Sequence, residues 1–184
     1  MAFQQDKYNQ LKRKDKSNEQ DIDKSIFKLC NKINSKNKYY TTSSCSGRIV
    51  LVKALEKKAE NIFLFKTHDK ITLKQLKKEL KKISYKDLIY FKQEPSLIVV
   101  ACNNINNAKI LFSKAQSSGF KRSGIILGKK RVICEMMSLE KLELPIKNKN
   151  KILLADSYLK LLVKEANNRM ENSRKRINRF EKAI

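Results

Sequence analysis

The residues best suited to chemistry form one run, which reads YYTTSSCSGR at positions 39–48. Five of the six positions 41–46 carry a hydroxyl group. Short hydroxyl side chains and a glycine allow backbone N–H groups to approach an anion closely, and Arg48 can hold a carboxylate or phosphate through two parallel hydrogen bonds. The run therefore predicts a ligand-binding segment, and a Ser/Thr-rich turn leading into a strand is the alternative interpretation.

The single histidine of the chain, His68, follows an apolar segment and is itself followed by Asp69. An imidazole can accept a proton at neutral pH, so His68 is a candidate general base. The alternative interpretation is a histidine in a loop that faces solvent.

Two basic segments could contact phosphates. The first, Phe120-Lys121-Arg122-Ser123-Gly124, joins a predicted helix to a predicted strand, so the aromatic ring could stack on a base while the cations hold phosphate. The second is the end of the last predicted helix, which carries Arg174, Arg176 and Arg179. A basic surface turn and a solvated helix end are the corresponding alternatives.

The charge of the whole chain constrains its partners. Of 184 residues, 42 are Lys or Arg and 18 are Asp or Glu, which gives a formal charge of +24. Such an excess favours a polyanion, with nucleic acid as the first candidate. An anionic membrane surface, for which the lack of Trp is unfavourable, and a Lys-rich composition without functional cause stay open. Without a membrane-spanning run or a secretory signal, we expect a cytoplasmic protein.

The cysteines and glycines exclude several kinds of site. The four cysteines lie far apart and lack metal-ligand spacing: Cys30, Cys45, Cys102 and Cys134. They predict reduced thiols and no metal site. The glycines form neither G-x-G-x-x-G nor a P-loop, which argues against the common nucleotide-binding folds.

Hydrophobic spacing predicts the elements that must position these residues. Helices are expected at 20–36, from Thr72 to about 83, from Asn104 to Gly119 and at 151–180, and strands at 49–52, 62–65, 88–90 and 97–102, with a hairpin at 123–127 and 131–136 and a loop at 39–48. This order predicts an α+β fold, a mixed β-sheet flanked by helices rather than a doubly wound fold, in one domain over 1–184. A Ser-Gly pair precedes a strand at 46–47 and again at 123–124, which suggests a weak internal duplication.

The run at 39–48 strongly resembles the signature of the wybutosine-synthesis methyltransferase family, the third enzyme of that tRNA-modification pathway. Further blocks match in the same order: Asp15-x-Ser17 with Asp23, His68-Asp69, Phe91-Lys92-x-Glu94-Pro95 before an apolar strand, Gly119-Phe-Lys-Arg-Ser-Gly-Ile125, and a closing helix with Ala166-Asn167, Asn172, Arg176-Ile177 and Arg179-Phe180. Two positions differ from the family pattern: Gln20 stands where a glycine is expected, and Val99 where the family has a histidine.

The resemblance implies transfer of a methyl group from S-adenosylmethionine to a ring nitrogen of a tricyclic guanosine derivative beside the anticodon of phenylalanine tRNA. His68 or Asp69 would take the proton from that nitrogen. The cofactor would be bound by Ser43, Ser44, Cys45, Ser46, Gly47 and Arg48. The anticodon arm would be contacted by Tyr39, Tyr40, Phe120, Lys121, Arg122, Ser123, Arg174, Arg176 and Arg179, with one of the aromatic rings stacked on the modified base.

A non-catalytic, basic RNA-binding protein explains the charge and the aromatic residues equally well. The segment 39–48 separates the two hypotheses, because a pure phosphate binder would place several Lys or Arg residues there rather than hydroxyl groups. Binding of S-adenosylmethionine to the isolated protein would discriminate between them.

Overall fold

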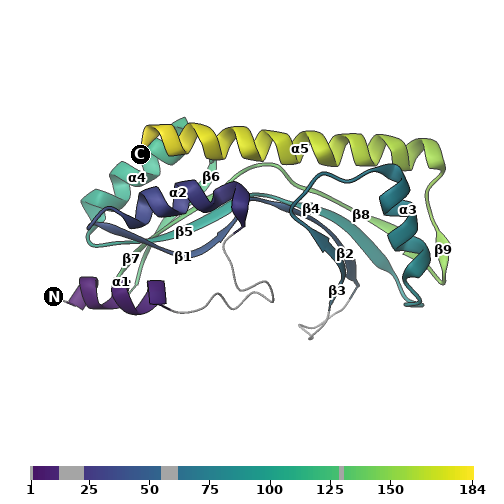
Figure 1. Cartoon of the computed structure of the whole chain (residues 1–184), viewed down its shortest axis with the longest axis horizontal. Helices are drawn as coiled ribbons and strands as arrows, with labels where there is room; N and C mark the ends of the chain where they lie inside the picture. Colours follow the sequence, from purple (N-terminus) through teal and green to yellow (C-terminus); the bar gives the residue numbers. More distant parts are fainter. Residues whose placement is uncertain (1, 13–22, 55–61, 129–130) are drawn as a thin grey trace. The chain divides into compact units, whose positions relative to one another are not determined.

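Figure 1 shows the computed structural model of the chain, which describes residues 2–12, 23–54, 62–128 and 131–184. The chain forms two compact units and passes four times from one to the other. Unit 1 contains Met1–Ser46, Ser96–Leu139 and Ser173–Ile184, and unit 2 contains Gly47–Pro95 and Glu140–Asn172. Each unit is described by itself below.

Unit 1 is built on a four-stranded sheet with the order β1-β5-β7-β6, in which all neighbouring strands are antiparallel. Its strands are β1 (Tyr39–Cys45), β5 (Leu97–Cys102), β6 (Arg122–Leu127) and β7 (Val132–Met137). Its helices are α1 (Ala2–Lys12), α2 (Lys24–Asn34), α4 (Ile105–Ser117) and the C-terminal part of α5 (Asp156–Ala183).

Alternation along β1 decides which side chains reach the core of unit 1. Tyr39 packs with the apolar faces of α2 and α4, which Figure 1 shows over the same face of the sheet. Tyr40 points to the other face, where its ring lies 5.1 Å from the ring of Phe3 in α1. Both tyrosines are therefore fixed by packing on opposite sides of one strand.

Unit 2 contains a five-stranded sheet with the order β3-β2-β4-β8-β9, again antiparallel throughout. Its strands are β2 (Arg48–Lys53), β3 (Phe63–Thr67), β4 (Ile89–Glu94), β8 (Leu142–Asn148) and β9 (Lys151–Ile152). Helix α3 (Leu73–Lys82) and the N-terminal part of α5 cover one face of this sheet (Figure 1).

The two faces of the unit 2 sheet differ in chemistry. Ile49 and Leu51 of β2 and Phe91 of β4 are buried in the core formed with α3 and α5. On the opposite face, Val50 and Val52 of β2 are also buried, whereas Arg48 of β2 and Lys92 and Glu94 of β4 are charged and partly exposed. This face is therefore mixed, with charged side chains beside buried valines.

Helix boundaries follow the capping signals in the sequence. Thr72 caps α3 by accepting a hydrogen bond from the backbone N–H of Gln75 at 3.1 Å, and Asn104 caps α4 through the N–H of Asn107 at 2.9 Å. Gly119 ends α4 with φ at 103°, a left-handed conformation that favours glycine. These three predictions are confirmed.

The α+β class is confirmed, and the fold is not doubly wound. The expected single mixed sheet is instead two sheets, in which every described pairing is antiparallel. Residues 39–45, expected to be a loop, form β1, because pairing with β5 supplies backbone hydrogen bonds that a polar Ser/Thr run does not reveal by itself. The last helix begins at Asp156, since residues 151–152 pair with β8. The single-domain organisation and the internal duplication stay predictions.

Within the part of the chain that the structure describes, no helix is both long enough and apolar enough to cross a membrane.

Candidate active site

The polar run at 39–48 spans a strand, a turn and the start of a second strand. Ser43 is exposed, and Ser44 and Cys45 are half-buried at the end of β1. A β-bulge lies between Thr41 and Ser43, where the pairing with β5 shifts by one residue. Ser46 belongs to unit 1, whereas Gly47 and Arg48 open unit 2, so the two parts of the run are described separately.

Asp23 holds the end of the run within unit 1. One carboxylate oxygen of Asp23 caps α2 by accepting from the N–H of Ser25 at 3.0 Å. The other oxygen accepts from the N–H of Ser46 at 3.1 Å and from the Ser46 hydroxyl. The two serines are thereby tied to one side chain, which gives this acidic residue a structural role that the sequence alone did not assign.

His68 directly follows β3 in unit 2 and lies beside the residue that precedes β2. Its Nδ1 is 3.0 Å from the carbonyl oxygen of Gly47. A carbonyl oxygen can only accept a hydrogen bond, so Nδ1 must carry the proton. The neutral imidazole then presents its basic lone pair at Nε2. Gly47 itself has φ at 98°, which explains why a glycine occupies this turn.

Arg48 is paired across the sheet with Glu94. The two residues are direct neighbours in the β2–β4 register, and Nε of Arg48 forms an ion pair with the Glu94 carboxylate. The guanidinium also lies over the ring of Phe63, 4.8 Å from its centroid. The side chains of Arg48 and Glu94 are 29% and 31% exposed, so both remain accessible to a ligand.

Glu94 is a site residue that sequence reasoning did not assign. In the sequence, Glu94 belongs to the Glu-Pro pair at the end of β4, and this pair is part of one of the blocks that resemble the family. The strand register turns this signal into a contact with Arg48, and a register cannot be read from the motif.

A second ion pair lies on the neighbouring strands of unit 2. Lys92 of β4 and Glu143 of β8 face each other, with 2.6 Å between Nζ and a carboxylate oxygen, and Lys141 reaches the other oxygen at 2.9 Å. Hydrogen bonds from Lys92 and Lys141 lower the pKa of Glu143 below its ordinary value. The sheet therefore presents paired charges of both signs beside Arg48 and Glu94.

The aromatic residues expected to stack on a base are buried in unit 1. Tyr39 is 4% exposed, and Tyr40 and Phe120 are 0% exposed. The hydroxyl of Tyr39 donates to the carbonyl of Asn107 at 3.1 Å, and the ring of Phe120 packs against Phe180. The expected stacking role of these rings does not fit, because each ring is part of the hydrophobic packing of its unit.

The basic candidates are more accessible. Lys121, Arg122 and Arg179 are exposed, and Arg174 and Arg176 are half-buried. The Arg176 side chain passes close to Gly119, where a Cβ atom would lie 3.0 Å from its Nε. The hydroxyl of Ser123 donates to the carbonyl of Phe120 at 2.6 Å, so it fixes the turn that carries Lys121 and Arg122.

The buried thiols are unsuited to nucleophilic chemistry. Burial raises the pKa of Cys30 to about 11 and that of Cys102 and Cys134 to about 12. Such groups are fully protonated at neutral pH. Cys45 is half-buried, and no disulfide joins any two of the four cysteines. The described residues contain no cluster of three or more His, Cys, Asp or Glu side chains that could hold a metal ion.

Asp69, the second candidate for a proton acceptor, is exposed.

Comparison with known proteins identifies the chemistry. Residues 4–184 match the profile of a family described as Methyltransferase TYW3. The "tRNA wybutosine-synthesizing protein 3 homolog" of Danio rerio is 38% identical over 189 residues, which cover 100% of this chain and 74% of the relative. An Archaeoglobus fulgidus protein is 36% identical over 170 residues, 91% of this chain and 85% of the relative; its name is tRNA(Phe) 7-((3-amino-3-carboxypropyl)-4-demethylwyosine(37)-N(4))-methyltransferase.

The fold agrees with this result. The solved structure of the PH1069 protein from Pyrococcus horikoshii superposes with a TM-score of 0.87 and 28% identity, covering 98% of this chain and 92% of that one. The chain is thus a methyltransferase, of an α+β type distinct from the doubly wound fold. It belongs to the TYW3 methyltransferase family, and the non-catalytic alternative is set aside.

Val99, which stands where the family resemblance predicts a histidine, pairs with Ser43 on one side and Glu135 on the other. A histidine at this position would lie next to the hydroxyl run, within unit 1. In this chain an aliphatic side chain takes that place, and the only histidine of the chain, His68, contacts Gly47 of the signature in unit 2.

Proposed function

We propose that the chain transfers a methyl group from S-adenosylmethionine to a ring nitrogen of the tricyclic guanosine derivative beside the anticodon of phenylalanine tRNA. The proposal is supported by membership of the TYW3 family and by the Archaeoglobus fulgidus relative, whose name gives N4 of a demethylwyosine as the methylated atom. We further propose that the enzyme works in the cytoplasm, where the four thiols would stay reduced.

The observation that carries the mechanism is the contact between Nδ1 of His68 and the carbonyl of Gly47 at 3.0 Å. This contact fixes the tautomer that leaves Nε2 as the proton acceptor. A ring nitrogen that receives a methyl group must lose its proton. We assign that proton to Nε2 of His68, with Asp69 as the second candidate.

The residues of the polar run fit the methyl donor. When bound, S-adenosylmethionine supplies a methyl group on a positively charged sulfonium. Arg48 uses its Nε for Glu94, and a guanidinium has five N–H donors, so it can also hold a carboxylate. Glu94 offers an acceptor for ribose hydroxyls and a negative charge for a sulfonium. Hydroxyl and backbone groups of the segment Ser43–Gly47 would complete the binding.

The exposed cations, rather than the buried rings, are proposed to contact the anticodon arm. The turn with Lys121 and Arg122 and the exposed Arg179 of α5 can each neutralise a phosphate. Arg174 and Arg176 are less exposed and would contact the RNA over part of their guanidinium groups.

The experiment that tests the base assignment replaces His68 by Gln and measures methyl transfer to tRNA from cells that lack this enzyme. We expect the turnover number to fall about 100-fold, because general-base catalysis typically contributes 10²–10⁴-fold. The variant should also lose the rise in rate with pH that deprotonation of an imidazole gives to the wild type.

Asp69→Asn is the matched control for the His68 variant, since it changes the next residue and removes the only other candidate base. An Asp69→Asn enzyme with a normal rate agrees with the assignment. If His68→Gln kept the wild-type rate and pH profile while Asp69→Asn lost activity, the proton would have to be assigned to Asp69.

A further inference from the structure

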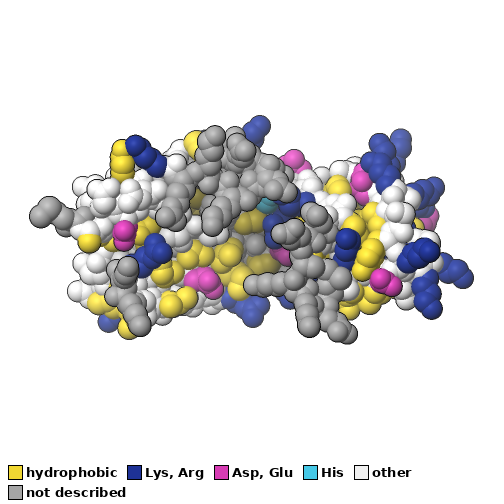
Figure 2. Space-filling model, turned by 90° about the horizontal axis from the view of Figure 1, so that it is seen from below, with side chains coloured by type: hydrophobic (Ala, Val, Ile, Leu, Met, Phe, Trp, Pro, Cys, Tyr) yellow, Lys and Arg dark blue, Asp and Glu magenta, His cyan; other side chains and the backbone are white. Residues whose placement is uncertain are grey.

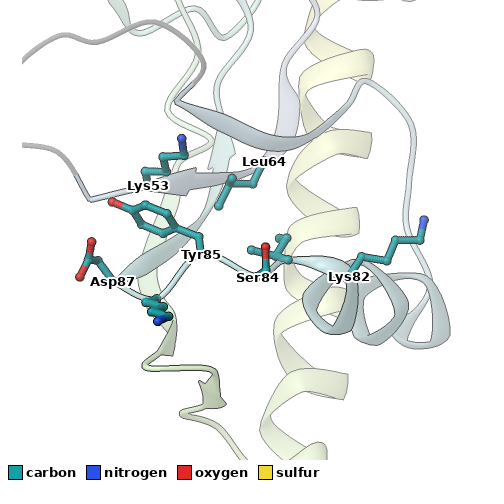
Figure 3. A pocket seen from close by; sticks show the side chains of 8 residues that line it. Lys53, Leu64, Lys82, Ser84, Tyr85 and Asp87 are labelled. Carbon is teal, nitrogen blue, oxygen red and sulfur yellow. The ribbon is translucent and has the colours of Figure 1, made fainter.

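A hollow of about 580 Å³ lies in unit 2, at the opposite end of β2 from Arg48. It is lined by Lys53 at the end of β2, Leu64 of β3, Lys82 at the end of α3, and the segment 83–87 that follows α3. Figure 3 shows the side chains of Lys53, Tyr85 and Asp87 together on one side of this hollow, with Lys82 projecting on the other.

The hollow is separate from the candidate active site. Lys53 is five residues from Arg48 along β2. A strand rises about 3.3 Å per residue, so the two positions are about 16 Å apart. Residues an odd number of positions apart also point to opposite faces, and Lys53 shares the face of Ile49 and Leu51.

The chemistry of the hollow is cationic and aromatic. Nζ of Lys53 lies 5.2 Å from the centroid of the Tyr85 ring, and Lys86 is exposed at the rim. Burial, the nearby Asp87 carboxylate and a hydrogen bond with that carboxylate raise the pKa of Tyr85, so the hydroxyl is held by Asp87 and the ring is the part of Tyr85 that a ligand can contact. Lysine beside an aromatic ring is the combination that contacts the phosphate and the base or ribose of one nucleotide.

A buried lysine offsets the negative end of α3 next to the hollow. Lys147 is 4% exposed, and its Nζ donates to the carbonyl oxygens of Leu80, at 2.8 Å, and of Ile83. These carbonyls belong to the C-terminal end of the helix, where the helix dipole is negative. With that end neutralised, an anion can approach the segment that follows it.

The surroundings favour a polymer over a free nucleotide. Helix α3 carries a series of exposed lysines: Lys74, Lys78 and Lys81. Figure 2 shows many Lys and Arg side chains over the part of unit 2 that carries α3 and β9. A basic surface that continues beyond the hollow suits a chain of phosphates.

We propose that this hollow binds one nucleotide of the RNA substrate at a distance from the methylated base, with Lys53 and Lys86 on the phosphate and Tyr85 against the base or ribose. The identity of the RNA as tRNA rests on the proposed function. The binding itself does not, since it can be measured without methyl transfer.

The test measures binding of a phenylalanine tRNA transcript to the full-length protein at several salt concentrations. We expect Lys86→Glu and Tyr85→Ala each to weaken binding about 10-fold. Lys86→Glu should also reduce the slope of log affinity against log salt by about 1, the amount expected for one phosphate contact. Tyr85→Phe keeps the ring and should bind nearly as the wild type does. Weaker binding by Tyr85→Ala but not by Tyr85→Phe is then due to the missing ring.

Lys160→Glu is the matched control, because it makes the same charge change at an exposed position of α5 in the same unit. Equal binding by Lys86→Glu and Lys160→Glu, together with wild-type binding by Tyr85→Ala, would overturn the proposal. At saturating tRNA the hollow variants should keep the wild-type turnover number. A wild-type protein that bound tRNA through this hollow but transferred no methyl group would refute the proposed function alone.

Discussion

At the scale of single residues, Arg48 and Glu94 are expected to act together in binding the methyl donor. The ion pair keeps the guanidinium in a fixed place on the sheet, and both side chains keep about 30% of their surface exposed. An ion pair that is this exposed contributes little to stability. We therefore expect the ion pair to contribute to ligand binding. A guanidinium that Glu94 already holds in place loses less rotamer entropy on binding a carboxylate than a free side chain would.

Arg48→Ala should raise the KM for S-adenosylmethionine about 10-fold or more, because it removes a charge-assisted hydrogen bond to the donor's carboxylate. Steady-state kinetics with saturating tRNA would measure the change. Lys92→Ala is the matched control, since Lys92 is also a cation of this sheet and is also paired with a carboxylate. Equal KM values for the two variants would contradict the role given to Arg48.

The sequence shows which residues carry a given chemistry, but it does not show which of them are buried. It suggests His68 as a base because His68 is the only histidine; that role stays a prediction, and the structure adds the contact of its Nδ1 with the carbonyl of Gly47. Tyr39, Tyr40 and Phe120 were chosen as stacking rings, and all three are buried. Aromatic residues serve cores as readily as they serve ligands, and only the fold decides which.

At the scale of elements, the N-cap of α2 also positions the end of β1. Asp23 accepts from Ser25 and from Ser46 with its two carboxylate oxygens. Helix α3 has a comparable cap in Thr72, whose described contact is with Gln75 of its own helix. The two caps therefore allow stability and activity to be separated.

Asp23→Ala should cost about 1 kcal/mol in the free energy of unfolding, the usual cost of losing an N-cap, and should also lower methyl transfer, because Ser46 loses its anchor. Thr72→Ala should cost a similar free energy and leave methyl transfer unchanged. Urea unfolding and single-turnover rates measure the two quantities. Equal activity of the two variants would show that Asp23 acts only as a cap.

Helices were predicted better than strands, for a physical reason. Caps and apolar spacing at Thr72, Asn104 and Gly119 are local signals, and the structure confirms them. Strand β1 has no such signal, because its Ser/Thr composition is equally typical of a loop. Its partner β5 is more than fifty residues away in the chain, and only that pairing makes the segment a strand.

At the scale of the whole molecule, the formal charge of +24 should govern RNA affinity. We expect tRNA binding to weaken steeply as the salt concentration rises. The slope of log affinity against log salt concentration should be steeper than a single phosphate contact would give. Filter binding from 50 to 300 mM salt would measure it. Vesicles of anionic lipid serve as the control, and binding to them as strong as to tRNA would favour the membrane-surface alternative instead.

The division of the chain has a consequence for how the protein can evolve. Neither unit is a continuous stretch of sequence, because the chain crosses between them after residues 46, 95, 139 and 172. Exchange of one unit between two genes would require four recombination breakpoints. The two units should therefore share a single ancestry, and phylogenetic trees drawn from each set of segments should have the same branching order.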